Sequence, residues 1–199
     1  MGKEMEFKLH IDSPAALAGI LADDELNALR QTDWTVRQMR TTYFDTPDRR
    51  LGARHWTLRF RQEGERPVVC LKTPSDDPRA RCELEITAPA MSEEALAALT
   101  TAGAPAELLT LYPLLRPICG AEFTRRSAIL TLPDGSTAEI AGDSGVLRGP
   151  TEQINFTELE LELYSGEITE TEALMRRLCV RYALHEEPKS KVARARRLK

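Results

Sequence analysis

The chain has 199 residues, of which 42% are hydrophobic and 29% are charged, and its formal net charge is −4. This length suits one sizeable domain or a domain and a half, and the apolar content is enough for a core. The modest charge gives no general sign of a nucleic-acid or anionic-membrane partner. The N-terminal segment MGKEMEFKLH lacks the apolar core of a signal peptide, and no stretch approaches the roughly 18 apolar residues of a membrane span. We therefore expect a soluble cytoplasmic protein. The four cysteines are far apart and form no CxxC pair, which argues against structural zinc and against a disulfide framework.

The first half of the chain is predicted to be mostly strands. Charged and apolar residues alternate over 3–12, and Ser13 and Pro14, a typical N-cap and first helical residue, then start an Ala/Leu-rich segment with helical spacing. Residues 34–45 are predicted to be extended and to end in the turn Asp45-Thr46-Pro47-Asp48. Three more strands are expected, the first two forming a hairpin around Glu63-Gly64-Glu65: 55–62, 66–73 and 80–87.

The second half begins with an Ala/Leu-rich segment over 92–111, predicted as one helix or as two broken near Gly103-Ala104-Pro105. Strands then return on both sides of the hairpin turn Pro133-Asp134-Gly135 and again over 155–165, followed by a helix over 168–184 and a basic, plausibly helical end. About eight strands and no internal repeat predict one α+β domain, built around a large antiparallel sheet or barrel.

Charges on the predicted strands are sorted by face and by sign. Side chains alternate between the two faces of a strand, so each strand has one apolar face and one charged face. The charged faces carry Glu4, Glu6 and Lys8; Arg59 and Arg61; Glu83 and Glu85; and Glu158, Glu160 and Glu162. Solvated faces of an ordinary sandwich are one explanation. However, three glutamates on one strand face repel one another unless a cation offsets them, which favours a barrel with the charged face inward and the helices outside.

A lumen of this kind predicts a particular ligand. Glutamate oxygens are hard ligands suited to Mg²⁺ or Mn²⁺, and Arg and Lys side chains suit phosphate oxygens. The mixture therefore fits a metal-chelated polyphosphate chain.

The ordered motifs of the chain resemble the CYTH, or triphosphate tunnel metalloenzyme, family. The ExExK strand of that family stands here as residues 4–8, and the other matching motifs follow in order: YFDTP (43–47), LRFR (58–61), LKT (71–73), ELE (83–85), Arg125, EIAGD (139–143), ELELEL (158–163) and SKVAR (190–194). The resemblance covers essentially the whole chain and is greatest to the bacterial inorganic triphosphatases. It implies a single CYTH domain over residues 1–199: an eight-stranded antiparallel β-barrel, or tunnel, with a charged lumen and flanking helices.

The resemblance also implies roles for individual residues. Glu4, Glu6 and Lys8 would be catalytic. The metal-site residues would be led by Glu4, Glu6, Glu158 and Glu160 and supported by Glu83, Glu85, Asp143 and Glu162. The phosphate-binding residues would be Lys8, Arg59, Arg61, Lys72, Arg125 and Lys191, the last of which would plug the tunnel. Two Mg²⁺ or Mn²⁺ ions would serve the hydrolysis of a terminal phosphoanhydride, the second positioning the attacking water.

The motifs recognise phosphates and leave the rest of the substrate open. Inorganic tripolyphosphate, cleaved to pyrophosphate and phosphate, is the leading expectation. Adenylate cyclase, thiamine triphosphatase and nucleoside or RNA triphosphatase activities are alternatives on the same fold, and so is a non-catalytic polyphosphate-binding module. Related bacterial domains often precede a helical CHAD domain. The resemblance therefore allows that this domain comes from a longer protein in which a CHAD domain follows it. Asp45-Thr46-Pro47 is interpreted as a turn element, and Trp56 is assigned to the outer wall.

Overall fold

The computed structural model describes residues 2–199, and side chains from Glu4 onward. Strands and helices alternate along the chain in this order: β1 (Gly2–His10), α1 (Pro14–Leu21), α2 (Asp24–Leu29), β2 (Thr35–Asp45), α3 (Arg50–Ala53), β3 (Thr57–Glu63), β4 (Arg66–Pro74), β5 (Arg81–Thr87), α4 (Glu93–Thr101), α5 (Glu107–Leu111), a 3-10 turn (Tyr112–Leu114), β6 (Arg116–Thr131), β7 (Thr137–Arg148), β8 (Gln153–Ser165), α6 (Ile168–Tyr182), β9 (His185–Glu186) and α7 (Lys191–Ala195). None of these helices is long and apolar enough to cross a membrane.

Eight of the described strands close into an antiparallel barrel. The order around it is β5-β4-β3-β2-β6-β7-β8-β1, and β1 returns to pair with β5. Strand β1 makes this closure because its two edges have different partners: Met5–His10 pair with β8, whereas Gly2–Glu4 pair with β5. The predicted α+β barrel is thus confirmed, and the two-residue strand β9 is an addition on the free edge of β1.

Several helix starts follow the capping signals of the sequence. Ser13 and Ser92 cap α1 and α4 by accepting hydrogen bonds from the backbone N–H groups of Ala16 and Ala95. The expected single helix after Pro14 was wrong in one respect, because the chain breaks between α1 and α2. Asp23 accepts N–H bonds from Glu25 and Leu26 and so starts a new helix, and Arg181 and Tyr182 of α6 hold its other oxygen.

The turn after β2 is built around a buried carboxylate. Asp45 accepts hydrogen bonds from the backbone N–H groups of Thr46, Leu51 and Gly52, and therefore starts the short helix α3. The interpretation of Asp45-Thr46-Pro47 as a turn element is confirmed.

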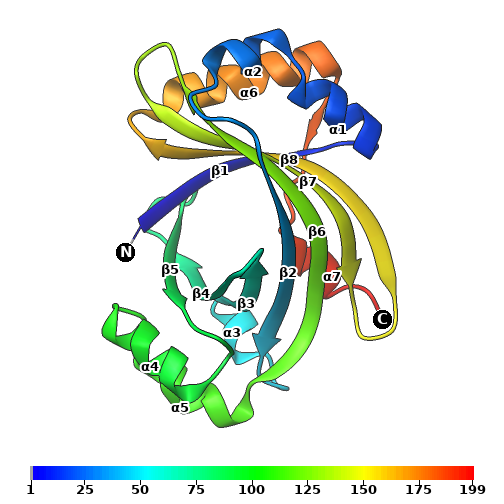
Figure 1. The fold of residues 1–199 in the computed structure, drawn as a ribbon. Coiled ribbons are helices and arrows are strands. Elements are labelled where there is room, and N and C mark those ends of the chain that lie inside the picture. The colour runs from blue at the N-terminus through cyan, green and yellow to red at the C-terminus, as the bar shows by residue number, and fades with distance from the viewer. Residues whose placement is uncertain (1) are drawn as a thin grey trace.

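The outside of the barrel is covered by helices in two groups, which lie at opposite ends of the molecule in Figure 1. Helices α1, α2 and α6 pack on the outward apolar side chains of β1, β6, β7 and β8, with Leu130, Ile140 and Leu174 fully buried at the contact. Helices α3, α4 and α5 cover β3 and β4, where Trp56 packs as expected. Burying each large aliphatic side chain stabilises the fold by about 2 kcal/mol, so the helices make the outward direction of the apolar faces favourable.

A third apolar cluster lies inside the barrel. Its members come from the inward rows of four strands and from the C-terminal segment: Met39, Tyr43, Cys119, Ala121, Phe123, Leu147, Phe156 and Ala195, with Ile118, Val192 and Leu198 packed against them. Helix α7 contacts β6 and β7. The cluster members that do not belong to the barrel wall are Val192 and Ala195 of α7 and Leu198, which follows this helix. The lumen therefore has an apolar, filled part and a charged part, and α7 separates them.

Gly145 of β7 is required by close approach of the neighbouring strand. A Cβ atom at this position would lie 2.1 Å from the carbonyl oxygen of Glu122, whereas a Cβ on Gly19 of α1 would meet nothing within 4 Å. We expect Gly145→Ala to lower the free energy of unfolding by about 1–3 kcal/mol, because backbone has to move. Gly19→Ala, the matched control, should raise it by about 0.5–1 kcal/mol. Urea unfolding measures both, and equal effects would contradict the clash.

Candidate active site

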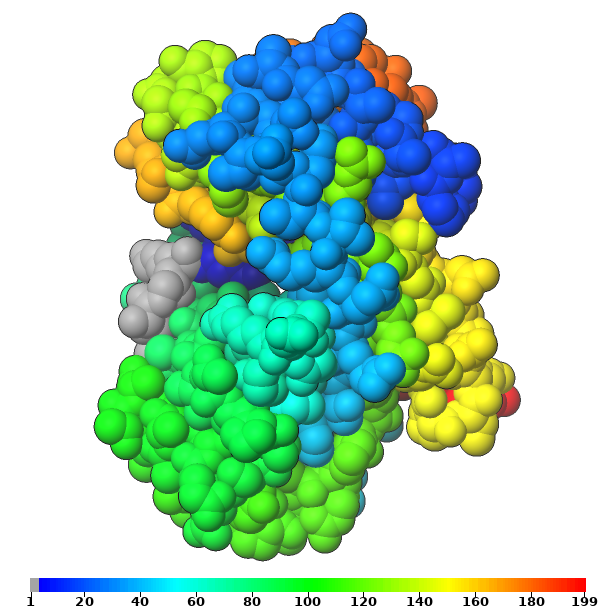
Figure 2. All heavy atoms as spheres, viewed as in Figure 1, coloured from blue at the N-terminus to red at the C-terminus, as the bar shows by residue number. Residues whose placement is uncertain are grey.

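The charged part of the lumen is a cavity of about 370 Å³. Residues from all eight barrel strands and α7 line it: Glu4, Glu6 and Lys8 (β1); Arg37, Met39 and Tyr43 (β2); Thr57, Arg59, Arg61 and Glu63 (β3); Arg66 and Lys72 (β4); Arg81, Glu83 and Glu85 (β5); Arg125 (β6); Glu139 (β7); Glu160, Glu162 and Tyr164 (β8); and Lys191 and Val192 (α7), with Ser190 before the helix. Figure 2 shows β1, in dark blue, recessed between the upper and lower parts of the molecule. Carboxylates and basic groups thus face one another across one chamber.

Three carboxylates from neighbouring strands form what we call the chamber triad: Glu4 and Glu6 of β1 and Glu162 of β8. One oxygen of each lies within 4.8 Å of one oxygen of the others. The barrel register causes this proximity, because Glu6 pairs directly with Glu162. Oxygen ligands at this spacing suit a hard divalent cation, so the residues present fit Mg²⁺ or Mn²⁺.

The chamber triad already has basic neighbours. Lys8 Nζ donates to Glu6 Oε1 at 2.7 Å, and Lys72 donates to Glu4. Burial lowers the pKa of Lys8, but Glu6 and Glu160 outweigh it and raise the pKa overall. Both amines are therefore ammonium groups that hold two of the three carboxylates. Glu162 has no ion pair among the side chains from Glu4 to Lys199.

Crowding changes the ionisation of Glu162. Burial, followed by the charges of Glu4 and Glu6, raises its pKa from 4.5 to about 8, although Lys72 opposes the shift. Metal-free protein consequently keeps a proton on Glu162 near neutral pH, and a cation that binds there displaces it.

This proton predicts a pH dependence of stability for the metal-free protein. Between pH 4.5 and about 8, Glu162 is protonated in the native state and ionised in the unfolded chain. The native state then binds more protons, so the free energy of unfolding falls as the pH rises, by up to about 1.4 kcal/mol per unit. In urea unfolding with a chelator present, we expect lower stability at pH 8 than at pH 6 and a shallower slope in Glu162→Gln. An unchanged slope in this variant would contradict the assignment.

At the inner end of the chamber, Lys191 lies among three buried carboxylates, which we call the plug cluster: Asp143, Glu158 and Glu160. Lys191 Nζ is 2.7 Å from Asp143 and 2.8 Å from Glu160, and it also pairs with Glu158. Burial opposes the charge of Lys191, but these carboxylates outweigh it and raise its pKa. Helix α7 is therefore attached to the barrel wall through a charged side chain.

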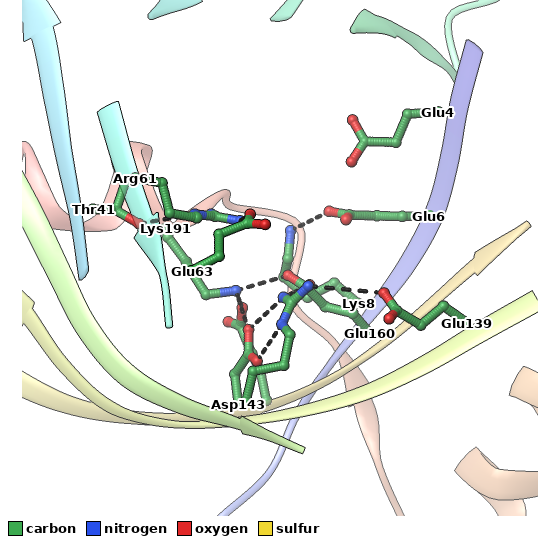
Figure 3. Close-up of polar contacts among 12 residues, drawn as sticks. Glu4, Glu6, Lys8, Thr41, Arg61, Glu63, Glu139, Asp143, Glu160 and Lys191 are labelled. Atoms are coloured by element: carbon green, nitrogen blue, oxygen red, sulfur yellow. Dashed lines mark hydrogen bonds and ion pairs between the residues drawn. The ribbon is translucent and has the colours of Figure 1, made fainter. Parts of the chain in front are cut away.

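Two arginines complete the plug cluster. Arg125 donates two hydrogen bonds to Asp143, at 2.8 and 2.7 Å, and another to Glu160, while Arg194 pairs with Glu158. Burial alone would raise the pKa of Glu160, but Lys191 and then Arg125 hold it well below its usual range. Figure 3 shows this cluster beneath Arg61 and Glu63, with Glu4, Glu6 and Lys8 projecting from β1 toward the same space.

The wall formed by β3, β4 and β5 carries a further cluster of possible metal-ligand side chains: Cys70, Glu83 and Glu85. Arg59 pairs with both glutamates, at 3.1 and 3.5 Å, and the Cys70 thiol donates to Glu83 at 2.8 Å. Burial raises the pKa of this thiol to about 12, so it stays protonated and donates. All four cysteines are free, as expected.

The predicted site residues thus divide into groups. The cavity lining contains Glu4, Glu6, Lys8, Arg59, Arg61, Lys72, Glu83, Glu85, Arg125, Glu160, Glu162 and Lys191. Asp143 and Glu158 do not line it: both are fully buried under Lys191. The emphasis therefore shifts for two residues, because Glu162, expected only as a supporting ligand, joins Glu4 and Glu6, whereas Glu158, expected to lead, lies behind the plug.

Several lining residues were not identified from the sequence. Arg37, Glu63, Arg66, Arg81, Glu139 and Tyr164 all belong to inward rows. A detectable signal was present for some of them, since Glu63 has the parity of Arg59 and Arg61, and Tyr164 continues the row of Glu158, Glu160 and Glu162. Extending each charged row to the end of its strand would have included them.

Comparisons with known proteins identify the family and the fold of the chain. The model of the CYTH domain matches residues 2–195. Among solved structures, a candidate adenylyl cyclase from Hippeastrum, described as having a dominant triphosphatase activity, is 18% identical, with a TM-score of 0.64 over 98% of this chain and 95% of that one. A candidate adenylate cyclase from Bacillus halodurans is 18% identical, with a TM-score of 0.60 and 96% coverage of both chains. The protein PH1819 from Pyrococcus horikoshii is 15% identical, with a TM-score of 0.58 and the same coverage. At these identities the likeness shows a shared fold.

Proposed function

Because the chain belongs to the CYTH family, we propose that it is a metal-dependent phosphohydrolase that cleaves inorganic tripolyphosphate to pyrophosphate and phosphate with Mg²⁺ or Mn²⁺. The observation that carries this proposal is the shared chamber, in which the Glu4–Glu6–Glu162 triad faces Arg59, Arg61 and Lys72. Carboxylates bind the cation, and the basic groups bind phosphate oxygens.

Ion-pair exchange couples the two kinds of binding. Glu4 and Glu6 are held by Lys72 and Lys8 in the free protein. Glu4 and Glu6 are the residues that would hold a cation, and Lys8 and Lys72, released from them, would then be available to the phosphates. A cation held there would supply polarisation of the phosphoryl oxygens. Lys8, Lys72, Arg59 and Arg61 orient the chain and stabilise the charge that moves to the leaving group.

The inner end of the chamber is basic and is backed by aromatic side chains. Lys191 and Arg125 point their charges into the cavity from the plug cluster, while Phe123 and Phe156 fill the space behind Lys191. A phosphate chain that enters from the mouth meets these two cations last. Phosphate binding by Lys191 and Arg125 stays a prediction from the resemblance.

A nucleoside triphosphatase is the second candidate. Tyr164 lines the cavity and is 54% exposed, so its ring is open to stacking against an organic group. Two of the structural neighbours are described as candidate adenylate cyclases, so cyclase activity is tested beside triphosphatase activity. A non-catalytic polyphosphate-binding module is the third candidate function. The chamber triad argues against it, because carboxylates repel phosphate when no cation is bound.

One phosphate-release panel separates these functions. Tripolyphosphate, ATP and thiamine triphosphate are compared with Mg²⁺, with Mn²⁺ and with chelator, and cyclic AMP is assayed from ATP. We expect tripolyphosphate to give the highest kcat/KM and chelator to abolish release. Preference for ATP would replace the inorganic substrate by a nucleotide, and affinity without release under any metal would favour the binding module.

The cytoplasmic location, the number of metal ions and a following CHAD domain stay predictions from the sequence. We expect neither nucleic acid nor membrane as a partner.

A further inference from the structure

Arg37 of β2 is a lining residue that the family motifs do not include. It belongs to the inward row of β2 with Met39 and Tyr43, and all three line the cavity. Its side chain is exposed, and it has no hydrogen bond or ion pair to any side chain from Glu4 to Lys199. The guanidinium is therefore a basic group at the solvent side of the chamber with its donors unused.

The other basic side chains of the described cavity lining are all engaged. Each pairs with a carboxylate, as Arg59 does with Glu83, or, in the case of Arg81, donates to backbone carbonyl oxygens of β4. An incoming anion must compete with those partners. At Arg37 it competes only with water, so the cost of binding is lowest there.

The position of Arg37 on the barrel adds a second reason. Arg37 and Arg125 pair directly across β2 and β6, and like charges in that position destabilise a sheet. Asp143 and Glu160 neutralise Arg125, whereas no carboxylate of the described residues neutralises Arg37. A negatively charged ligand group next to Arg37 would remove the imbalance.

We propose that Arg37 is a substrate-binding residue that holds a phosphate group of the chain at the mouth of the chamber. This inference rests on the proposed function, since the ligand is taken to be a linear phosphate chain. The phosphates nearer the plug are held by groups that must first leave their carboxylates, and Arg37 holds the outer end meanwhile. A guanidinium suits this task, because its planar donors match two phosphate oxygens.

The test compares Arg37→Gln with Arg40→Gln. Arg40 lies three residues along the same strand on the outer face, with its side chain 77% exposed, so both variants lose one charge and only one of them faces the chamber. Isothermal titration of tripolyphosphate into metal-free protein should show about tenfold weaker binding for Arg37→Gln, and binding within twofold of wild type for Arg40→Gln. In turnover, Arg37→Gln should raise KM by a similar factor and leave kcat within twofold.

Equal affinities of the two variants would overturn the inference. A loss of affinity in Arg37→Gln that appears when ATP is titrated, but not when tripolyphosphate is titrated, would also overturn it, because Arg37 would then recognise an organic group. Absence of turnover in the wild type would refute the proposed hydrolysis alone, since the metal-free titration reports on Arg37 without catalysis. Arg37 is exposed and has no side-chain hydrogen bond or ion pair to lose among the described residues, so both variants should fold, and thermal melting checks this.

Discussion

Replacing Glu6 by Gln should reduce tripolyphosphate hydrolysis on the order of 100- to 1,000-fold at saturating substrate. Glu6 is the central member of the chamber triad, paired across the sheet with Glu162 and flanked on its own strand by Glu4. The amide keeps the size of the side chain and removes one negative charge, so the cation is held by fewer charges and less stably positioned. Metal chemistry contributes several kcal/mol to barriers of this kind, and each 1.36 kcal/mol changes the rate tenfold.

The measurement pairs phosphate release with a Mn²⁺ titration of the same protein. Weaker Mn²⁺ binding in Glu6→Gln should accompany the loss of rate. Glu65→Gln, in the exposed turn between β3 and β4, makes the same chemical change away from the chamber and should match wild type. Retained turnover in Glu6→Gln at saturating Mn²⁺ would remove the triad from the mechanism.

The same alternation that places Glu6 in the lumen made the fold predictable. Period-2 patterns identified the strands, and the sorting of charge by sign favoured a closed barrel over a solvated sheet. Ser13, Ser92 and the Pro133-Asp134-Gly135 turn are local signals that work through their own backbone neighbours. Such signals can be identified without tertiary information.

Depth along the tunnel could not be predicted in this way. Glu158, Glu160 and Glu162 are equivalent by alternation, yet one is behind the plug, one is at the boundary and one belongs to the chamber triad. What distinguishes them is the register of β8 against β1, which pairs Glu162 with Glu6 and Glu158 with His10. Register depends on turns, bulges and packing far from the residues concerned.

Arg37 was missed for a related reason. Its strand carries Arg37 and Arg40 on opposite faces, so the charges of β2 are not sorted as those of β1 or β8 are. Only closure of the barrel shows which of the two faces the chamber.

The plug cluster shows how a chamber rich in glutamate can exist before any ligand binds. Basic side chains from other strands and from α7 neutralise most carboxylates, so the resting protein substitutes its own cations for the metal. Near the mouth these pairs are partly exposed and can exchange. At the inner end they are buried, and their removal should cost stability.

Replacing Lys191 by Met should therefore lower the free energy of unfolding by about 3–5 kcal/mol at pH 7. Methionine retains most of the volume between Phe123 and Phe156, so the main change is the loss of a charge that three buried carboxylates share. Arg125 and Arg194 remain, but each already has its own carboxylate. The deficit should appear in urea unfolding as a lower midpoint.

The pH dependence of that deficit identifies its electrostatic origin. Lys191 and Arg125 hold the pKa of Glu160 well below its usual range, so this carboxylate stabilises the wild type above pH 4.5, and the contribution is lost as the pH falls through the depressed pKa. Without Lys191 this contribution is smaller, and the difference in stability between variant and wild type should shrink as the pH is lowered below 4.5. Lys189→Met, two residues earlier on the exposed approach to α7, makes the same substitution and should change stability by no more than about 0.5 kcal/mol. If Lys191→Met were as stable as Lys189→Met, or if its deficit stayed constant as the pH fell below 4.5, the Lys191 charge would not be what holds α7 to the barrel.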